Sequence, residues 1–204
     1  MRTYIDRPLT VNIAVWPGDT PFSLVEAHWD TVRVGSVHMS LHTGTHIDAP
    51  RHLQGFTAPV SSIPDDHLCG NYDFIDATGQ AVIGVEMFQK ISTSRVLIKT
   101  SAWLNSDVFP ITFPLLTIEA TNFLVNKGIH LLGIDLPSVD RVDSKELSIH
   151  RILIGAGVTI LEGLDLSAVS TTPSNGRLMV VPLNLPSADA APVRAWIESA
   201  LPSL

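Results

Sequence analysis

Alternation of apolar and polar residues predicts several short strands along the chain. Within residues 30–41 the apolar positions are Val32, Val34, Val37, Met39 and Leu41. This period of two predicts a strand, with a bulge at Gly35 and Ser36, where the alternation slips. Further strands are predicted over residues 72–77, 95–100, 129–134, 158–161 and 178–183.

Helices are predicted between and after these strands, over residues 117–127, 144–154 and 193–201. Gly128 ends the first helix, Ser144 begins the second as its N-cap, and the glycines at Gly155 and Gly157 end it. Strands dominate, with helices interspersed. The pattern therefore predicts an α/β or α+β fold in one domain that spans residues 1–204.

Composition limits the classes of protein to which the chain can belong. Its 204 residues are 45% hydrophobic and only 16% charged, which excludes general disorder. The formal net charge is −7, and there is no run of Lys and Arg, so we expect neither nucleic acid nor an anionic membrane as a partner. Sparse charge also indicates that a second copy of the chain covers some apolar surface.

Cysteine usage and the N-terminus bear on the compartment. Cys69 is the single cysteine, so no intrachain disulfide is possible, and beyond His67 it has no local partner that would make it a good nucleophile. The first residues lack the apolar core of a signal peptide, and no apolar stretch approaches the ~20 residues of a membrane span. We therefore expect a soluble, cytoplasmic protein.

Three of the eight histidines lie within one short segment that runs from His42 to His52. The segment also contains His46 and Asp48, so all four candidate ligands occupy even positions, which share a face in an extended chain. Gly44 permits a close backbone approach or a positive φ. Imidazole and carboxylate together suit zinc, or less selectively manganese and iron. The spacing predicts a metal site, and an exposed polar loop or a purely structural metal site is the alternative.

A second polar cluster stands out against apolar surroundings. His150 lies in an otherwise apolar predicted helix, and Glu162 directly follows an apolar predicted strand. Together they could complete a second metal position. Taken singly, His150 could be a core histidine and Glu162 a surface residue at the end of a strand. Asp135 and Asp140 are as well explained by turns or caps as by function.

These residues resemble a known family. The segment from His42 to His52 matches the signature of the cyclase-like metal-dependent hydrolases, His-x-Gly-Thr-His-x-Asp-x-Pro-x-His. Within that family the chain is similar along nearly its whole length to the bacterial kynurenine formamidases, or arylformamidases. The further matching segments lie at residues 15–22, 133–145, 150–163, 182–183 and 191–195.

The resemblance implies a swivelling β/β/α fold in a single domain, a homodimer and a site that holds two Zn2+ ions, with Mn2+ as a possible substitute. The implied ligands are His42, His46 and Asp48 for the first zinc, and Asp48 as a bridge with His150 and Glu162 for the second, with Glu162 also touching the first. The implied acid/base residue is His52. Trp16 would line the substrate pocket, although it could also be a core or interface aromatic.

The implied reaction is hydrolysis of N-formyl-L-kynurenine to L-kynurenine and formate in tryptophan degradation. A metal-activated water would attack the formyl amide, with His52 as the acid/base group. The chain departs from the formamidase pattern after His52, at Asn184 and at Ala191, so another small amide, imide or isatin-like lactam is the alternative substrate. A third hypothesis is a metal-binding or ligand-binding protein without activity, and the presence of His52 argues against it.

Overall fold

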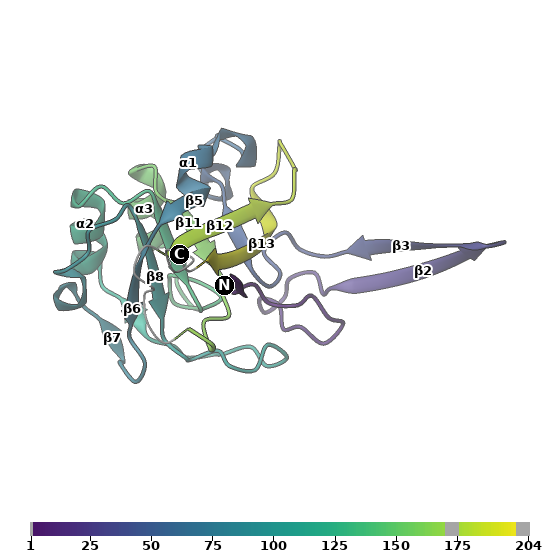
Figure 1. Ribbon diagram of the computed structural model, residues 1–204, viewed down its shortest axis with the longest axis horizontal. Helices are drawn as coiled ribbons and strands as arrows, with labels where there is room; N and C mark the ends of the chain where they lie inside the picture. The colour runs from purple at the N-terminus through teal and green to yellow at the C-terminus, as the bar shows by residue number, and fades with distance from the viewer. Residues whose placement is uncertain (1, 170–175, 199–204) are drawn as a thin grey trace, which may run out of the picture.

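The computed structural model describes residues 2–169 and 176–198, which form one nine-stranded mixed sheet, helices packed against it and a projecting hairpin (Figure 1). From edge to edge the strands are β5 (Cys69–Asn71), β12 (Arg177–Pro182), β13 (Ala190–Glu198), β4 (His46–Asp48), β11 (Thr159–Glu162), β10 (Leu131–Ile134), β8 (Arg95–Lys99) and β6 (Asp73–Asp76), and β1 (Arg2–Tyr4) also pairs with β13. Strands β6, β8, β10 and β11 are parallel to one another. Strands β4, β13, β12 and β5 each run antiparallel to their neighbours.

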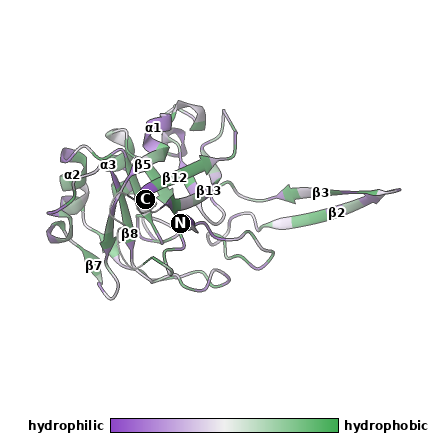
Figure 2. Ribbon diagram, viewed as in Figure 1, coloured by the Kyte–Doolittle hydropathy of each residue, from purple (hydrophilic) through white to green (hydrophobic). Residues whose placement is uncertain are grey.

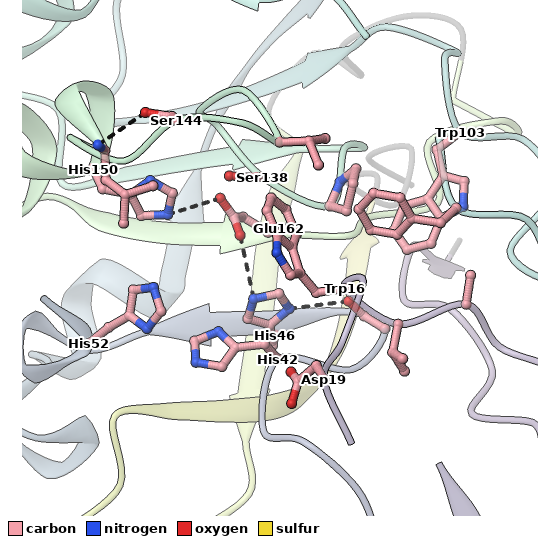
Figure 3. Close-up of a pocket in the computed structure, with 17 residues that line it drawn as sticks. Trp16, Asp19, His42, His46, His52, Trp103, Ser138, Ser144, His150 and Glu162 are labelled. Carbon is pink, nitrogen blue, oxygen red and sulfur yellow. Dashed lines mark hydrogen bonds and ion pairs between the residues drawn. The ribbon is translucent and has the colours of Figure 1, made fainter. Parts of the chain in front are cut away.

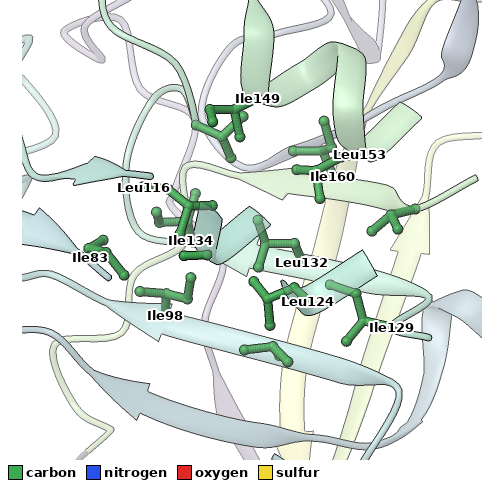
Figure 4. Packing of buried hydrophobic residues seen from close by; sticks show 14 of the residues in the cluster. Ile83, Ile98, Leu116, Leu124, Ile129, Leu132, Ile134, Ile149, Leu153 and Ile160 are labelled. Carbon is green, nitrogen blue, oxygen red and sulfur yellow. The ribbon is translucent and has the colours of Figure 1, made fainter. Parts of the chain in front are cut away.

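Both faces of the central sheet are buried, because successive side chains of a strand point to opposite faces. Helices α2 (Ile118–Asn126) and α3 (Ser148–Gly155) cover one face (Figure 4). The strand residues beneath them include Val96, Ile98, Leu132, Ile134 and Ile160. The strand residues in the cluster on the other face include Leu97, Leu131, Leu161, Leu178 and Ile197. The predicted α/β fold with interior strands is therefore confirmed.

Helix α2 begins and ends where its sequence predicts. The Thr117 side chain accepts a hydrogen bond from the Ala120 amide at 3.0 Å, and Gly128 follows the helix with a φ of +75°. Helix α3, by contrast, begins at Ser148, so the predicted start at Ser144 is wrong. The reason is that Asp140, from the preceding loop, accepts from the first amides of α3 and takes the role of the cap.

The predicted terminal helix over 193–201 is also wrong, because residues up to Glu198 belong to strand β13. Ala195 and Ile197 are buried, whereas Arg194, which precedes them, is exposed. Burial therefore alternates with the period of two that is typical of a strand. Strands β1, β4 and β12 all pair with β13, so its conformation depends on distant partners. Residues 199–201 of the predicted helix lie outside the described residues.

The predicted strand over 30–41 is β3 (Val32–His38), and it pairs with β2 (Ser23–Trp29), which the sequence pattern had not indicated. The register is continuous, with Glu26 opposite Gly35, so the predicted bulge is wrong. The two strands form a hairpin that extends away from the sheet (Figure 1).

The remaining elements are short. They are α1 (Asp65–Leu68), β7 (Val82–Ile83), β9 (Leu115–Leu116) and the 3-10 helices η1 (Pro50–His52), η2 (Val60–Ser62) and η3 (Val85–Phe88). Within residues 2–169 and 176–198, none of the helices has the length and apolar character needed to cross a membrane.

Candidate metal centre

Strand β4 places two of the predicted ligands on one side of the sheet. His46 and Asp48 are two residues apart and therefore share a face, while Ile47 between them points into the core. His46 pairs with Glu162 at the end of β11. The side chains of His46, Asp48 and Glu162 are all buried, so the reading of Glu162 as a surface residue is wrong.

The other two residues of the histidine segment reach the same place by turns. His42 lies in a turn before β4, and His52 ends the 3-10 helix η1 after it, so the expectation of one extended segment holds only for β4 itself. The His42 ring lies 4.4 Å from the His52 ring and 4.9 Å from the His46 ring, measured between centroids. The turns thus bring the three imidazoles together.

Two glycines allow this close approach of the loop before β4 to the end of β11. Gly44 has a φ of +68° and Gly163 a φ of +69°, a region that side chains disfavour. A Cβ added to Gly163 would collide with the carbonyl oxygen of Gly44. Glycine is therefore required directly after Glu162, where the backbones touch.

Helix α3 brings His150 into the cluster, as Figure 3 shows. Its Nε2 lies 3.4 Å from Asp48 Oδ2 and 3.4 Å from Glu162 Oε1. On the other side, His46 Nε2 lies 3.4 Å from Glu162 Oε2 and 3.6 Å from Asp48 Oδ1. His42 Nδ1 lies 3.1 Å from Asp48 Oδ1. All five predicted ligands therefore converge, although they come from three separate parts of the chain.

The polar atoms at this centre are better explained as ligands of a metal ion than as hydrogen-bond partners of one another. His46 Nε2 and both carboxylate oxygens of Asp48 are buried, yet within the described part of the chain they have no hydrogen-bond partner. Buried polar atoms without partners are rare in proteins. Two ligands of a tetrahedral ion with bonds of about 2.0–2.2 Å lie roughly 3.3–3.6 Å apart, which matches most of the separations here. The donor set of imidazoles and carboxylates suits zinc.

Each of the three candidate ligand histidines has a polar partner at its second ring nitrogen. His46 Nδ1 lies 3.2 Å from the Gly44 carbonyl oxygen, and His150 Nδ1 lies 2.7 Å from Asp140 Oδ2. His42 Nε2 donates to Asp189 Oδ2 at 3.2 Å. Such outer contacts fix the tautomer and the orientation of a ligand histidine.

Sequence reasoning left Asp140 as a turn or cap residue and missed Asp189. Asp140 is a cap and also the partner of the His150 ring. No local signal could identify Asp189, because it lies 147 positions from His42 in the sequence. The hydrogen bond from His42 lowers the pKa of Asp189 to about 2.

Protons are shared within the cluster between bases and acids. Burial opposes the charge on His42, but its contacts with Asp189 and Asp48 raise its pKa to about 10. Burial likewise opposes the charge on His150, but its contacts with the carboxylates of Asp140, Asp48 and Glu162 raise its pKa. Burial would raise the pKa of Asp48, but His150 and His42 hold it well below the usual range. A cation and these protons compete for the same atoms, since metal ligands bind in the deprotonated form.

A cavity of about 330 Å³ opens beside the cluster. Its lining includes His42, His46, His52, His150 and Glu162 together with the aromatic residues Trp16, Trp103 and Phe109. The Trp16 ring packs edge-to-face on Phe109, with centroids 5.4 Å apart. Trp16 thus lies where the family resemblance implies, and Trp103 and Phe109 are aromatic wall residues that sequence reasoning missed.

His52 is the cavity histidine whose nearest carboxylate is farthest away. Its Nδ1 lies 3.8 Å from Asp189 Oδ2, and its ring is 5.8 Å from that of His150. Burial is the main cause that lowers the pKa of His52. The imidazole is therefore neutral at neutral pH and able to accept a proton.

Comparison with known proteins agrees with this geometry. The solved structure of a predicted metal-dependent hydrolase from Bacillus stearothermophilus is similar, with a TM-score of 0.83, 29% identity and 97% of each chain covered. The fold and the site together define a metal-dependent hydrolase, and the chain is an enzyme of that class. A sequence model of the family described as "Putative cyclase" matches residues 5–141. The chain belongs to this cyclase family.

Curated relatives lie within the same family. A kynurenine formamidase from Bacillus cereus is 41% identical over 202 residues, which cover 95% of this chain and 95% of the relative. A kynurenine formamidase from Geobacillus thermodenitrificans is 41% identical over 208 residues, covering 97% and 98% of the two chains. The predicted resemblance is confirmed over almost the whole length.

Proposed function

We propose that this chain hydrolyses N-formyl-L-kynurenine to L-kynurenine and formate, a step of tryptophan degradation, as one domain over residues 1–204. The convergence of three imidazoles and two carboxylates beside an aromatic-lined cavity carries the proposal. Relatives named kynurenine formamidase, 41% identical over 95% of the chain, support this choice of substrate. The cytoplasmic location stays a prediction from the sequence.

The proposed cofactor is a pair of Zn2+ ions, with Mn2+ as the alternative. His42, His46 and Asp48 would hold one ion, and His150 and Glu162 the other. The two oxygens of Asp48 support its role as a bridge, because Oδ1 faces His42 and His46 while Oδ2 faces His150. Glu162 is divided in the same way, with Oε2 toward His46 and Oε1 toward His150.

Bound zinc would supply a Lewis acid that polarises the formyl carbonyl and lowers the pKa of water. A water molecule that adds to the formyl carbon must lose a proton, and the departing aryl nitrogen must gain one as the C–N bond breaks. His52 is the group that we assign to both transfers, because it lines the cavity and is neutral at neutral pH.

The cavity walls suit a small aromatic substrate. A volume of about 330 Å³ lies at the lower end of the range for ligand sites, which suits one ring with short substituents. Trp16, Trp103 and Phe109 offer ring faces and edges to an aryl group. A formyl group carries only hydrogen beyond its carbonyl, so a narrow site next to the ligands would exclude larger acyl groups.

Removal of metal provides the direct test. We expect chelation to lower the rate of formate release from N-formyl-L-kynurenine by more than about 100-fold, because the Lewis acid that activates water is removed. Added zinc should restore the rate. Metal per chain is measured on the same samples and should be close to two. A panel with isatin and small imides runs in parallel.

Three results would contradict the proposal in different ways. Equal rates before and after chelation would exclude the metal mechanism. Metal without formyl-kynurenine hydrolysis but with turnover of isatin or an imide would favour the alternative substrate class. A protein that binds no metal would refute the ligand assignment itself.

We further propose that the chain forms a homodimer through the β2–β3 hairpin. One face of the hairpin is apolar and more than two-fifths exposed at Val25, Trp29, Val32 and Val34. The opposite face carries the charged group Glu26, His28 and Arg33, together with the exposed Leu24 and Val37 nearer the base of the hairpin. A lone two-stranded hairpin is marginally stable in water, so an uncovered apolar face of this kind calls for a partner. Figure 2 shows the hydrophobic colouring along the projecting strands.

A matched pair of lysine substitutions tests the dimer. Val34→Lys places a charge on the apolar face and should convert the dimer to monomers, since a buried unpaired charge is costly. His28→Lys adds the same side chain on the opposite face, beside Glu26, and should leave the dimer intact. Molar mass by light scattering distinguishes the outcomes. A wild-type monomer, or a Val34→Lys dimer as tight as wild type, would contradict this interface.

A further inference from the structure

One carboxylate oxygen lies between a predicted metal ligand and the predicted acid/base residue. Asp189 Oδ2 is 3.2 Å from His42 Nε2 and 3.8 Å from His52 Nδ1. Among the described residues, no other acidic oxygen lies within 4.0 Å of a ring nitrogen of His52. Asp189 is therefore placed to act on both imidazoles at once.

The backbone around Asp189 is tied to the segment that carries His52. The Asp189 carbonyl oxygen accepts from the Ala49 amide at 2.8 Å, immediately before η1. Arg51 donates to the Ser187 carbonyl oxygen at 2.6 Å. The next residue, Ala190, begins β13 opposite Asp48. None of these contacts uses the Asp189 side chain, so they persist when that side chain is replaced.

For His42, the contact decides which nitrogen can bind a metal. His42 Nδ1 faces Asp48, and Nε2 faces Asp189. A carboxylate only accepts hydrogen bonds, so it keeps the proton on Nε2 and leaves the Nδ1 lone pair for the metal. This arrangement repeats at His150, where Asp140 holds Nδ1 and leaves Nε2 toward the centre.

For His52, the same oxygen lies at ion-pair distance from one ring nitrogen, Nδ1. The His42 and His52 rings lie 4.4 Å apart at a tilt of 49°, so they contact each other as well as the carboxylate. If Nδ1 stays near Asp189, the other ring nitrogen stays on the opposite side of the ring. A change at Asp189 would then disturb a metal ligand and the acid/base group together.

We propose that Asp189 is a positioning residue that couples the orientation of the metal-binding His42 to that of His52. The part concerning His52 rests on the proposed function, whereas the part concerning His42 needs only metal binding. Asp140 has a second role as the cap of α3, whereas the Asp189 side chain is 45% exposed and, among the described residues, forms ion-pair contacts with His42 and His52 alone. Its replacement should spare the fold.

The test compares Asp189→Leu, which removes the acceptor, with Asp189→Asn, which keeps an acceptor oxygen for His42. Asp76→Asn is the matched control, since Asp76 is exposed and caps a turn at Thr78 away from the cavity. Zinc affinity is measured by competition with a coloured chelator. The values of kcat and KM are measured with N-formyl-L-kynurenine as substrate, and folding is checked by thermal melting. For Asp189→Leu we expect zinc binding weaker by about 10–100-fold and a lower kcat at saturating zinc, with KM little changed.

Recovery of most of the zinc affinity in Asp189→Asn would support the role of the hydrogen bond. Zinc affinity and kcat of Asp189→Leu equal to those of Asp76→Asn would overturn the proposal, and so would an asparagine variant as impaired as the leucine variant. If the leucine variant does not fold, Asp189→Ala removes the acceptor without adding bulk and is judged in the same way. A wild type that binds zinc without formamidase activity refutes the proposed function, but the zinc affinities still decide the role of Asp189 at His42.

Discussion

Asp48→Asn is expected to abolish hydrolysis, with a rate loss of more than about 1000-fold. The reason is that both proposed ions lose the ligand that they share, and without the ions the attacking water is no longer activated. The carboxylate is fully buried, and its oxygens face His42 and His46 on one side and His150 on the other. Asparagine has nearly the same shape but offers a neutral amide, which is a poor zinc ligand. We therefore expect metal content to fall from two ions per chain toward zero.

Asp135→Asn provides the control for loss of a buried carboxylate. Asp135 is also buried, and it accepts hydrogen bonds from Thr100 and Ser101 rather than facing the histidines. This variant should lose about 1–3 kcal/mol of stability, because a buried group is left badly paired, yet keep its metal. Metal analysis, melting temperature and activity separate the two effects. Full metal content in Asp48→Asn would remove Asp48 from the ligand set.

His52→Ala is expected to lower kcat by about 10²–10⁴-fold while the metal content stays unchanged, because a proton acceptor is lost and no proposed ligand is touched. The cavity left by the ring should admit imidazole, so added imidazole should restore part of the rate. His67→Ala is the control, since His67 is partly buried and bonds to Thr159 outside the cavity. Activity of His52→Ala within a few-fold of this control would exclude His52 as the acid/base group.

The pH dependence of the wild type should agree with this role. Burial lowers the pKa of His52 below the ordinary value of 6.5, and nearby cations would lower it further. A histidine that acts as a base must be neutral, so it is active above its pKa. Its ability to accept a proton is lost as the pH falls through that pKa. We therefore expect the midpoint of the acid-side fall in kcat/KM to lie below pH 6.5. A midpoint above pH 6.5 would contradict the direction of this shift.

The local sequence pattern was sufficient to predict the elements in which burial repeats regularly along the strand or helix. Strands β8, β10 and β11 and helix α2 lie where alternation, helical spacing and caps predict them. Pattern failed at β13, which has a helix-compatible sequence yet is paired along its length by β1, β4 and β12. It failed also at the start of α3, where the cap is Asp140, eight positions before Ser148 rather than a neighbour.

The sequence by itself determined that a dense group of imidazoles and a carboxylate lies in one short segment. It also pointed to His150 and Glu162 as a second polar cluster, to which the family resemblance gave the role of metal ligands. Only the tertiary structure decided that these groups meet, because β11 must pair with β4 and α3 must pack over the sheet before His150 and Glu162 reach Asp48. It alone revealed Asp189, carried to His42 by the pairing of β13 with β4. Ligand type is a property of single residues, whereas convergence depends on strand pairing between segments more than a hundred residues apart, which no local pattern encodes.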